Sequence, residues 1–176
     1  MKAILDTSVL LTLYSLNLFQ YLMFLYDEVR IPREVEREFL YNIKDFAEQN
    51  KRFDFISNFY EKHRVWCKPC NEYGSDLVAL YLSNKKIDKG EAEVFAQNQA
   101  LGSVYELLLD ENEGRKVAKS QQWQHHGVLY ILAKLEIRLQ LCDYYKSLRI
   151  LKSKGIGRFS EDIIKQVYEI EKLKQA

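Results

Sequence analysis

Short apolar runs alternate with longer amphipathic stretches along this chain, and the alternation predicts the order of its strands and helices. Residues 2–5 form an apolar run that ends at an acid, which is typical of a buried parallel strand. Further strands are expected at 28–31, 64–68 and 104–109, and a loop at 125–127. Helices are expected at 8–26 with a break near residue 17, at 32–40 with Pro32 as the first helical residue, and at 46–62, 76–82, 91–101, 113–122, 128–141, 144–152 and from 161 onward.

Strands that alternate with helices imply a parallel sheet with helices on both faces. The sequence therefore predicts an α/β fold, a three-layer sandwich with a central parallel sheet of four to five strands. Its 176 residues are enough for one domain with its own core. We expect residues 1–176 to form that single domain, with residues 128–176 as a C-terminal helical extension packed on it.

The composition indicates a globular protein, because 47% of the residues are hydrophobic and 29% are charged. The net charge of +1 gives no overall field that attracts a polyanion, so a nucleic-acid partner must be held by local basic patches or by metal. Three cysteines, an odd number, argue against a disulfide framework and predict a reducing, cytoplasmic location.

The uncharged stretch 7–26 is long enough to span a bilayer, but its pattern argues against a membrane segment. Thr12, Ser15, Asn17 and Gln20 interrupt it, and no cluster of Lys or Arg borders it. Asp6 lies where the apolar run of a signal peptide should begin, so we expect neither a signal peptide nor a membrane association.

Cys67 and Cys70 form a C-x-x-C pair with His63 nearby, which suggests a zinc or redox site. A structural zinc site usually needs four ligands, and Cys142 is far away in the sequence. The favoured interpretation is two small buried residues around a strand that ends at Pro69.

Two acids share one local context, since Asp6 follows Ala-Ile-Leu and Asp110 follows Leu-Leu-Leu. Ligands of open α/β sheets bind outside the carboxyl ends of the strands, so these carboxylates converge if the two strands are neighbours. Close carboxylates repel unless a cation or a proton intervenes, and hard oxygen ligands select Mg²⁺ or Mn²⁺. The alternative is that each Asp is simply a helix N-cap.

Glu91 falls inside the arc marked by Val94 and Phe95 on a helical wheel, whereas Glu93 points to solvent. A buried carboxylate needs a partner, for which the helix N-terminus or a metal ion would serve. In the helix after Pro32, Glu36 and Glu38 flank the buried side equally and Glu34 faces away. The wheel alone does not choose between Glu36 and Glu38.

Four short motifs occur in order: ILDTSVL at 4–10, IPREVERE at 31–38, DKGEAE at 88–93 and LDENEGRKVA at 109–118. Together they resemble the PIN domain, the nuclease fold of many prokaryotic toxins of toxin–antitoxin pairs. The second motif resembles P-x-x-V-x-x-E, which selects Glu38. The third and fourth resemble motifs of one PIN-like subfamily, and the resemblance spans nearly the whole chain.

The resemblance implies a metal-dependent endoribonuclease that hydrolyses RNA phosphodiester bonds. It assigns one or two Mg²⁺ or Mn²⁺ ions to four carboxylates and gives supporting roles to Thr7 and Ser8. Arg115 beside the site, with Lys116 and Lys119, would contact RNA phosphates. A solvated helix face explains the lysines equally well, and a structural ion pair with an acid of the cluster explains Arg115 equally well. An antitoxin partner and a homodimer are also implied. The residues assigned to metal and catalysis are Asp6, Glu38, Glu91 and Asp110.

One departure from the subfamily concerns Val128, because the residue after the matching glycine is usually Thr. The missing hydroxyl favours a second interpretation, a catalytically weak or inactive PIN-like module that binds RNA or protein. A phosphotransferase would need a nucleophilic Asp-x-Asp, but Ser8 stands two residues after Asp6. His125 and His126 are interpreted as loop residues that PIN-type chemistry does not require.

Overall fold

The computed structural model of the protein describes residues 1–43, 49–70, 74–157 and 159–175. Strands and helices alternate along the chain in the predicted order. The elements are β1 (Lys2–Leu5), α1 (Thr7–Ser15), the 3₁₀ helix η1 (Phe19–Phe24), β2 (Glu28–Pro32), α2 (Arg33–Asn42), α3 (Gln49–His63), β3 (Cys67–Cys70), α4 (Ser75–Leu82), α5 (Lys89–Ala100), β4 (Glu106–Leu108), α6 (Asn112–Ser120), β5 (His125–His126), α7 (Val128–Ile137), α8 (Tyr144–Ser153) and α9 (Glu161–Leu173).

The strands of the described chain form one five-stranded parallel sheet in the order β3-β2-β1-β4-β5. The chain first moves outward from β1 through β2 to β3 and then crosses to β4 on the other side of β1. Leu5 pairs with Leu108, so the carboxyl ends of β1 and β4 lie side by side. This reversal of strand order is where ligands bind in open α/β sheets. The predicted fold class is confirmed.

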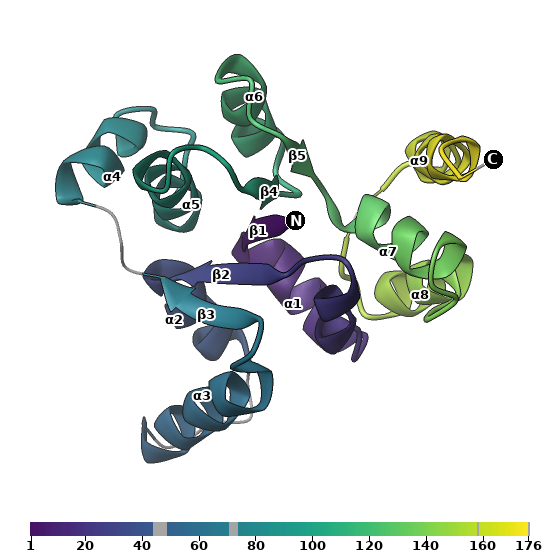
Figure 1. Ribbon diagram of the computed structural model, residues 1–176, viewed down its shortest axis with the longest axis horizontal. Coiled ribbons are helices and arrows are strands. Elements are labelled where there is room, and N and C mark those ends of the chain that lie inside the picture. Colours follow the sequence, from purple (N-terminus) through teal and green to yellow (C-terminus); the bar gives the residue numbers. More distant parts are fainter. Residues whose placement is uncertain (44–48, 71–73, 158, 176) are drawn as a thin grey trace.

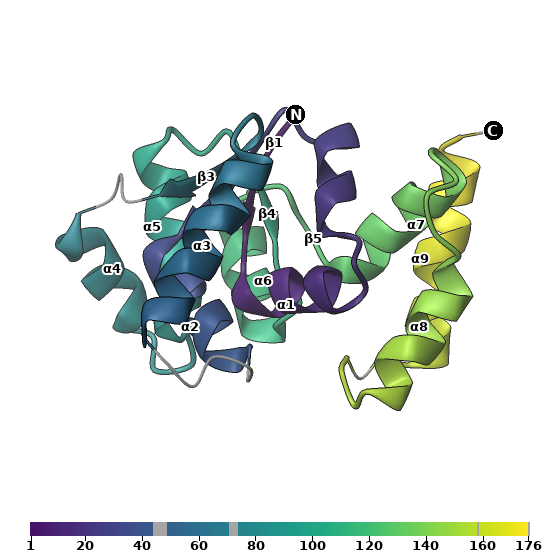
Figure 2. The same cartoon turned by 90° about the horizontal axis from the view of Figure 1, so that it is seen from below.

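Helices cover both faces of the sheet (Figure 1). Helices α4, α5 and α6 lie above the strands in that view, and α1, α2 and α3 lie below them. Helices α7, α8 and α9 lie together at one end of the molecule, as the view from below shows (Figure 2). Helix α7 contacts α1 and packs against both α8 and α9. The C-terminal helices therefore stand beside the β5 end of the sheet.

The centre of the sheet is fully buried, as a strand covered on both faces requires. Ala3, Ile4 and Leu5 of β1 and Leu107 and Leu108 of β4 are all inaccessible to solvent. These near-continuous apolar runs explain why the sequence pattern located the two strands correctly.

The helix predicted for 8–26 is two elements, because α1 ends at Ser15 and η1 follows it. Asn17, where a break was predicted, has a left-handed backbone with φ of 57°. Asparagine tolerates this conformation better than most residues. None of the helices in the described ranges is long and apolar enough to cross a membrane.

One strand prediction was displaced, one was too long, because β4 spans Glu106–Leu108 rather than 104–109, and one strand was missed. The third strand begins at Cys67 rather than at residue 64, because a turn between His63 and Trp66 precedes it and pairing with β2 sets its register. Pro69 is tolerated within it because β3 is an edge strand. The loop predicted at 125–127 contains β5, a two-residue strand paired with β4. Two histidines on a sheet edge carry no apolar pattern that reveals a strand.

Several helix boundaries also differ from the predictions. Pro32 ends β2 and is the N-cap of α2, so it precedes the first helical residue. Helix α5 begins at Lys89 because Asp88 caps it. Helix α7 ends at Ile137, before Gln140, whose φ is 54°. The predicted start of α3 at 46 lies outside the described residues.

The C-x-x-C pair is part of the core. Cys67 and Cys70 are buried and lie at the two ends of β3. The ring of His63 lies 5.2 Å from the rings of both Phe19 and Trp66, in an aromatic cluster. Successive strand residues face opposite sides of a sheet, so positions three apart diverge. The favoured interpretation of two buried structural cysteines agrees with this packing.

Candidate functional site

Asp6 and Asp110 follow the paired ends of β1 and β4. The Asp6 backbone N–H donates to the Leu108 carbonyl at 3.0 Å, which extends the β1–β4 pairing to the first acid. Asp6 is 4% exposed. Burial, together with the charges of Asp88 and Asp110, raises the pKa of Asp6 to about 7, although hydrogen bonds from Ser8 and Thr7 act against the shift. The charge of Asp110 therefore disfavours ionisation of Asp6.

Asp6 is held by the first residues of α1. The Thr7 backbone N–H donates to Oδ1 and the Ser8 hydroxyl donates to Oδ2, each at 2.7 Å. Asp6 is also the N-cap of α1, so the alternative interpretation as a cap holds for this residue. Capping uses one oxygen, and both oxygens are fixed in direction by the two bonds.

Asp110 is not a helix cap, because the N-cap of α6 is Glu111. Its Oδ1 accepts from the Val128 backbone N–H at 3.0 Å and from Arg115 Nη2 at 3.2 Å. Burial raises the pKa of Asp110, and the bonds from Val128 and Arg115 only partly offset that rise. The capping alternative is therefore wrong for Asp110.

Glu91 combines the two roles that the sequence left open. It forms a capping box with Asp88, in which Asp88 Oδ1 accepts from the Glu91 N–H at 2.8 Å and Glu91 Oε2 accepts from the Asp88 N–H at 3.3 Å. The other oxygen, Oε1, is buried and has no hydrogen-bond partner among the described residues. Burial and the charge of Asp88 raise the pKa of Glu91 to about 7. This carboxylate is thus only half satisfied.

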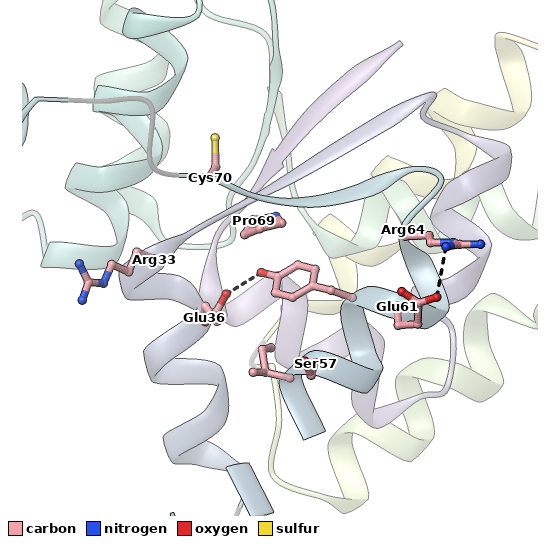
Figure 3. A pocket seen from close by; sticks show the side chains of 9 residues that line it. Arg33, Glu36, Ser57, Glu61, Arg64, Pro69 and Cys70 are labelled. Carbon is pink, nitrogen blue, oxygen red and sulfur yellow. Dashed lines mark hydrogen bonds and ion pairs between the residues drawn. The ribbon is translucent and has the colours of Figure 1, made fainter. Parts of the chain in front are cut away.

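The side chains of Glu38 and Glu36, both on α2, bind different neighbours. Glu38 Oε2 accepts from the Thr7 hydroxyl at 2.5 Å, which places it beside the start of α1. Burial raises the pKa of Glu38, and the hydrogen bond from Thr7 partly offsets that rise. Glu36 instead accepts from the Tyr60 hydroxyl at 2.8 Å, at a separate pocket of about 550 Å³ between α2, α3 and β3 (Figure 3).

Two glycines show how closely these side chains approach one another. A Cβ on Gly90 would lie 3.1 Å from Glu38 Oε2 and 3.5 Å from Thr7 Oγ1. A Cβ on Gly114 would lie 2.3 Å from Glu91 Oε1. The absent side chains leave the space that the carboxylates occupy, so the G-E pair at 90–91 and the glycine of α6 are steric requirements of this arrangement.

Two acids expected at the surface are buried. Glu34 is 3% exposed and binds Arg37 and Lys89, the latter at 3.0 Å. Glu93 is 6% exposed and accepts from the Glu34 backbone N–H at 2.6 Å. The helical wheel failed because α5 is buried on all sides from residue 90 to 98, with α2 on one flank and α4 on another. These acids join α2 to α5.

The sequence interpretation also missed two acids of the cluster. The charge of Asp88 raises the pKa of Asp6, Glu38 and Glu91, after burial as the first cause. Glu111 acts likewise on Asp110 and Glu91. The D-x-x-E spacing of a capping box at 88–91 is a signal that could have identified Asp88. We call the resulting cluster the acidic face; it comprises Asp6, Glu38, Asp88, Glu91, Asp110 and Glu111.

A long groove of about 1440 Å³ opens from the acidic face and runs between α1, α7 and α9. Ser8, Asp110 and Arg115 line it at one end, and Lys174 lines it on α9. Lys116 and Lys119 are exposed on α6 and do not line the groove. Lys116 pairs with Glu113 at 2.6 Å. Of the three predicted RNA contacts, only Arg115 therefore lies beside the acids.

The donor set of the acidic face suits a hard divalent cation, because every candidate ligand is a carboxylate oxygen. The orphaned Glu91 Oε1 and the raised pKa values of the four predicted ligands indicate missing positive charge. In the described part of the chain, however, no three His, Cys, Asp or Glu side chains are close enough to hold one ion together. The carboxylate oxygens of the acidic face suit a divalent metal ion. To bind one ion together, these carboxylates would have to move closer to one another.

Comparison with curated proteins gives no match. A family model described as a PIN domain matches residues 2–172. That range contains every strand of the sheet and all six acids of the acidic face. PIN domains are typically nucleases and commonly use divalent metals. The chain belongs to the PIN domain family.

Proposed function

We propose that this protein is a metal-dependent endoribonuclease that hydrolyses RNA phosphodiester bonds. The observation that carries the proposal is that acids following β1 and β4 and acids on α2 and α5 influence one another where the strand order reverses. Burial raises the pKa of Asp6 and of Glu91 to about 7, so added positive charge would stabilise the ionised cluster.

The proposed ligands are Asp6, Glu38, Glu91 and Asp110. A divalent ion bound by them supplies charge neutralisation and a bound water of lowered pKa. Glu91 is suited to this role because Oε2 is fixed by the capping box while Oε1 has no described partner. The remaining acids, Asp88 and Glu111, add negative charge that strengthens the attraction of a cation.

The residues around the ligands orient them. Ser8 fixes the direction of Asp6 by donating to Oδ2, and Thr7 fixes Glu38 by donating to Oε2. Arg115 donates to the Leu109 carbonyl at 2.9 Å as well as to Asp110, so its guanidinium is held at the mouth of the groove. There it is positioned to contact a phosphate of the substrate.

A second candidate function, binding without cleavage, is favoured by the environment of Asp110. Its Oδ1 already accepts two hydrogen bonds, one of them from the Arg115 cation. Val128 contributes only its backbone N–H, since its side chain is fully buried. If Arg115 does not release this oxygen, the protein binds RNA or a protein partner without cutting. The toxin role, the antitoxin and the homodimer rest on the resemblance alone and stay predictions.

A cleavage assay separates the two candidates. Labelled single-stranded RNA is incubated with Mn²⁺ and with wild-type protein, the Asp6→Asn variant or the Glu113→Gln variant. Glu113 is the matched control, because it lies on α6 near the site but pairs with Lys116. The nuclease predicts cleavage by wild type and Glu113→Gln, loss with Asp6→Asn, and loss in chelator. If the RNA stays intact in every reaction while binding is retained, the result supports binding without cleavage and contradicts the nuclease.

A further inference from the structure

Three basic side chains line the groove that leaves the acidic face, and each contacts a buried or nearly buried carboxylate. Arg115 pairs with Asp110 at 3.2 Å at the near end. His126 Nδ1 lies 2.7 Å from Glu106 Oε1. Lys174 pairs with Glu171 at 2.6 Å on α9. The carboxylate side chains of Glu106 and Glu171 are only 2% and 1% exposed, so they fix their cations from inside the protein.

His126 is held on two sides. Glu106, which also accepts from the Tyr26 hydroxyl at 3.0 Å, binds the Nδ1 edge of the ring. Tyr130 stacks on its face, with ring centroids 3.6 Å apart and an interplanar angle of 12°. Burial opposes ionisation of Glu106, but the hydrogen bond and charge of His126, with the charge of Lys134, lower its pKa below the usual value. Glu106 is therefore an anion that can only accept, so Nδ1 carries the hydrogen.

With Nδ1 committed to Glu106, Nε2 is the ring nitrogen left for a ligand. The side chain is 35% exposed and lines the groove. No described residue forms a recorded hydrogen bond with Nε2. His126 immediately precedes Gly127 and Val128, and the Val128 N–H contacts Asp110. His126 is thus only two residues before Val128, whose backbone N–H donates to Asp110 of the acidic face.

Lys174 reaches the same region from the opposite wall. Its Nζ lies 5.5 Å from the centroid of the Tyr130 ring, on which His126 stacks. Its side chain is 49% exposed, so the ammonium remains available to a ligand while Glu171 limits its freedom. Cations whose geometry is fixed before binding lose less entropy when they meet an anion.

We propose that His126 and Lys174 form a phosphate-binding subsite in this groove, which holds the substrate backbone next to the scissile position. This inference rests on the proposed nuclease function and deepens it. A phosphate fits because the Lys174 ammonium donates, because Nε2 of His126 also donates when both ring nitrogens carry hydrogen, and because a strand lying along the groove would also pass Arg115. A metal ion does not fit, because Lys174 brings positive charge and has no acceptor.

The subsite is tested by RNA binding at several salt concentrations, measured in the Asp6→Asn background so that the strand stays intact. Each lost phosphate contact on a single strand reduces the slope of log K against log salt concentration by about 0.7. The variants are His126→Gln, His126→Ala and Lys174→Ala, with Lys172→Ala as the matched control. Lys172 is an exposed lysine on the same helix that does not line the groove.

Glutamine at 126 separates binding from a structural role. Its amide can donate to Glu106, as the imidazole does, but it then presents an uncharged carbonyl oxygen to the groove. We expect His126→Gln and Lys174→Ala each to lower the slope by about 0.7, and Lys172→Ala to leave it unchanged. The subsite would be overturned if His126→Gln and Lys174→Ala both kept the wild-type slope. It would also be overturned if His126→Gln bound RNA as tightly as wild type while His126→Ala did not.

The nuclease proposal is judged separately by wild-type cleavage. Cleavage by wild type together with unchanged slopes in His126→Gln and Lys174→Ala rejects the subsite alone. Absence of cleavage with reduced slopes rejects the nuclease and leaves an RNA-binding groove. An equal loss of slope in Lys172→Ala means that general surface charge is responsible, and it also rejects the subsite.

Discussion

Asp6 and Glu106 are buried to nearly the same extent, with 4% and 3% of their surface exposed, but their environments act in opposite directions. Burial and the charges of Asp88 and Asp110 raise the pKa of Asp6 to about 7. For Glu106, His126 and Lys134 more than compensate for burial and lower the pKa. The fold therefore surrounds one acid with acids and the other with cations.

The contrast indicates that the acidic face, unlike the surroundings of Glu106, depends on a cation from outside the chain. Around Glu106 the protein supplies its own counter-charges from β5 and α7, as a buried charge requires. On the acidic face Arg115 is the cation bound to a proposed ligand, and the pKa of Asp110 is still raised beside it. Among the described residues, Glu91 and Glu106 each have one buried orphan oxygen, but burial and neighbouring acids raise the pKa of Glu91 whereas neighbouring cations lower that of Glu106 despite its burial.

The largest expected effect is on the pH dependence of stability. Folding raises the pKa of Asp6 and of Glu91 to about 7, from 3.8 and 4.5. Between those values the folded state binds more protons than the unfolded state, so stability falls as pH rises. We expect a loss on the order of 4 kcal/mol between about pH 5 and pH 7 in chelator. Denaturation at both pH values tests this, and the fall should disappear in Asp6→Asn combined with Glu91→Gln.

The next effect concerns the free energy of unfolding, which should fall when Glu106 is neutralised but not when Asp6 is neutralised. Glu106→Gln leaves His126 and the buried Lys134 without their anion, and we expect it to reduce the free energy of unfolding by about 3 kcal/mol. Asp6→Asn relieves repulsion with Asp88 and Asp110, so in chelator we expect unchanged or increased stability. Urea denaturation measures both. Equal destabilisation by the two substitutions would remove the distinction between the regions.

A smaller effect is expected from filling the space beside Glu91. In Gly114→Ala the new methyl group would lie 2.3 Å from Glu91 Oε1, so the flexible carboxylate must move. We expect Mn²⁺ affinity to fall about 10- to 100-fold with little loss of stability. Gly74→Ala is the control, because a Cβ there meets nothing within 4 Å. Wild-type Mn²⁺ affinity in Gly114→Ala, measured by calorimetry, would argue that Glu91 is not a ligand.

The smallest effect should come from the hydroxyl that orients Asp6. Ser8→Ala removes the 2.7 Å bond to Oδ2, and we expect about a tenfold loss of cleavage rate. The control is Ser120→Ala, whose hydroxyl donates to the Val117 carbonyl on exposed α6. Equal rates for the two variants would show that the backbone N–H of Thr7 suffices to position Asp6.

The sequence was most informative where one physical factor dominates. The apolar runs before Asp6 and Asp110 determine buried strands, and parallel pairing then brings the two acids together. The left-handed turn at Asn17, where a helix break was predicted, follows from local chemistry. The motif-based choice of Glu38 agrees with its contact to Thr7.

The rest depends on tertiary contacts that a single-helix pattern does not contain. Glu34 and Glu93 are buried because α2 and α5 pack against each other, and a wheel treats each helix as if its outer side faced water. The strand at His125 and His126 exists because β4 offers a free edge. The contact of His126 with Glu106 joins residues 20 apart, and no local pattern marked it.

The central claim, that the acidic face is completed by a divalent cation, is tested most directly by thermal denaturation with Mn²⁺ and with chelator. A ligand at about 100 times its Kd stabilises a protein by about 2.7 kcal/mol. We predict a clear rise in Tm with millimolar Mn²⁺ for wild type and Glu113→Gln, and little or none for Asp6→Asn and Glu91→Gln. An unchanged wild-type Tm, or an equal rise in all four proteins, would contradict the account.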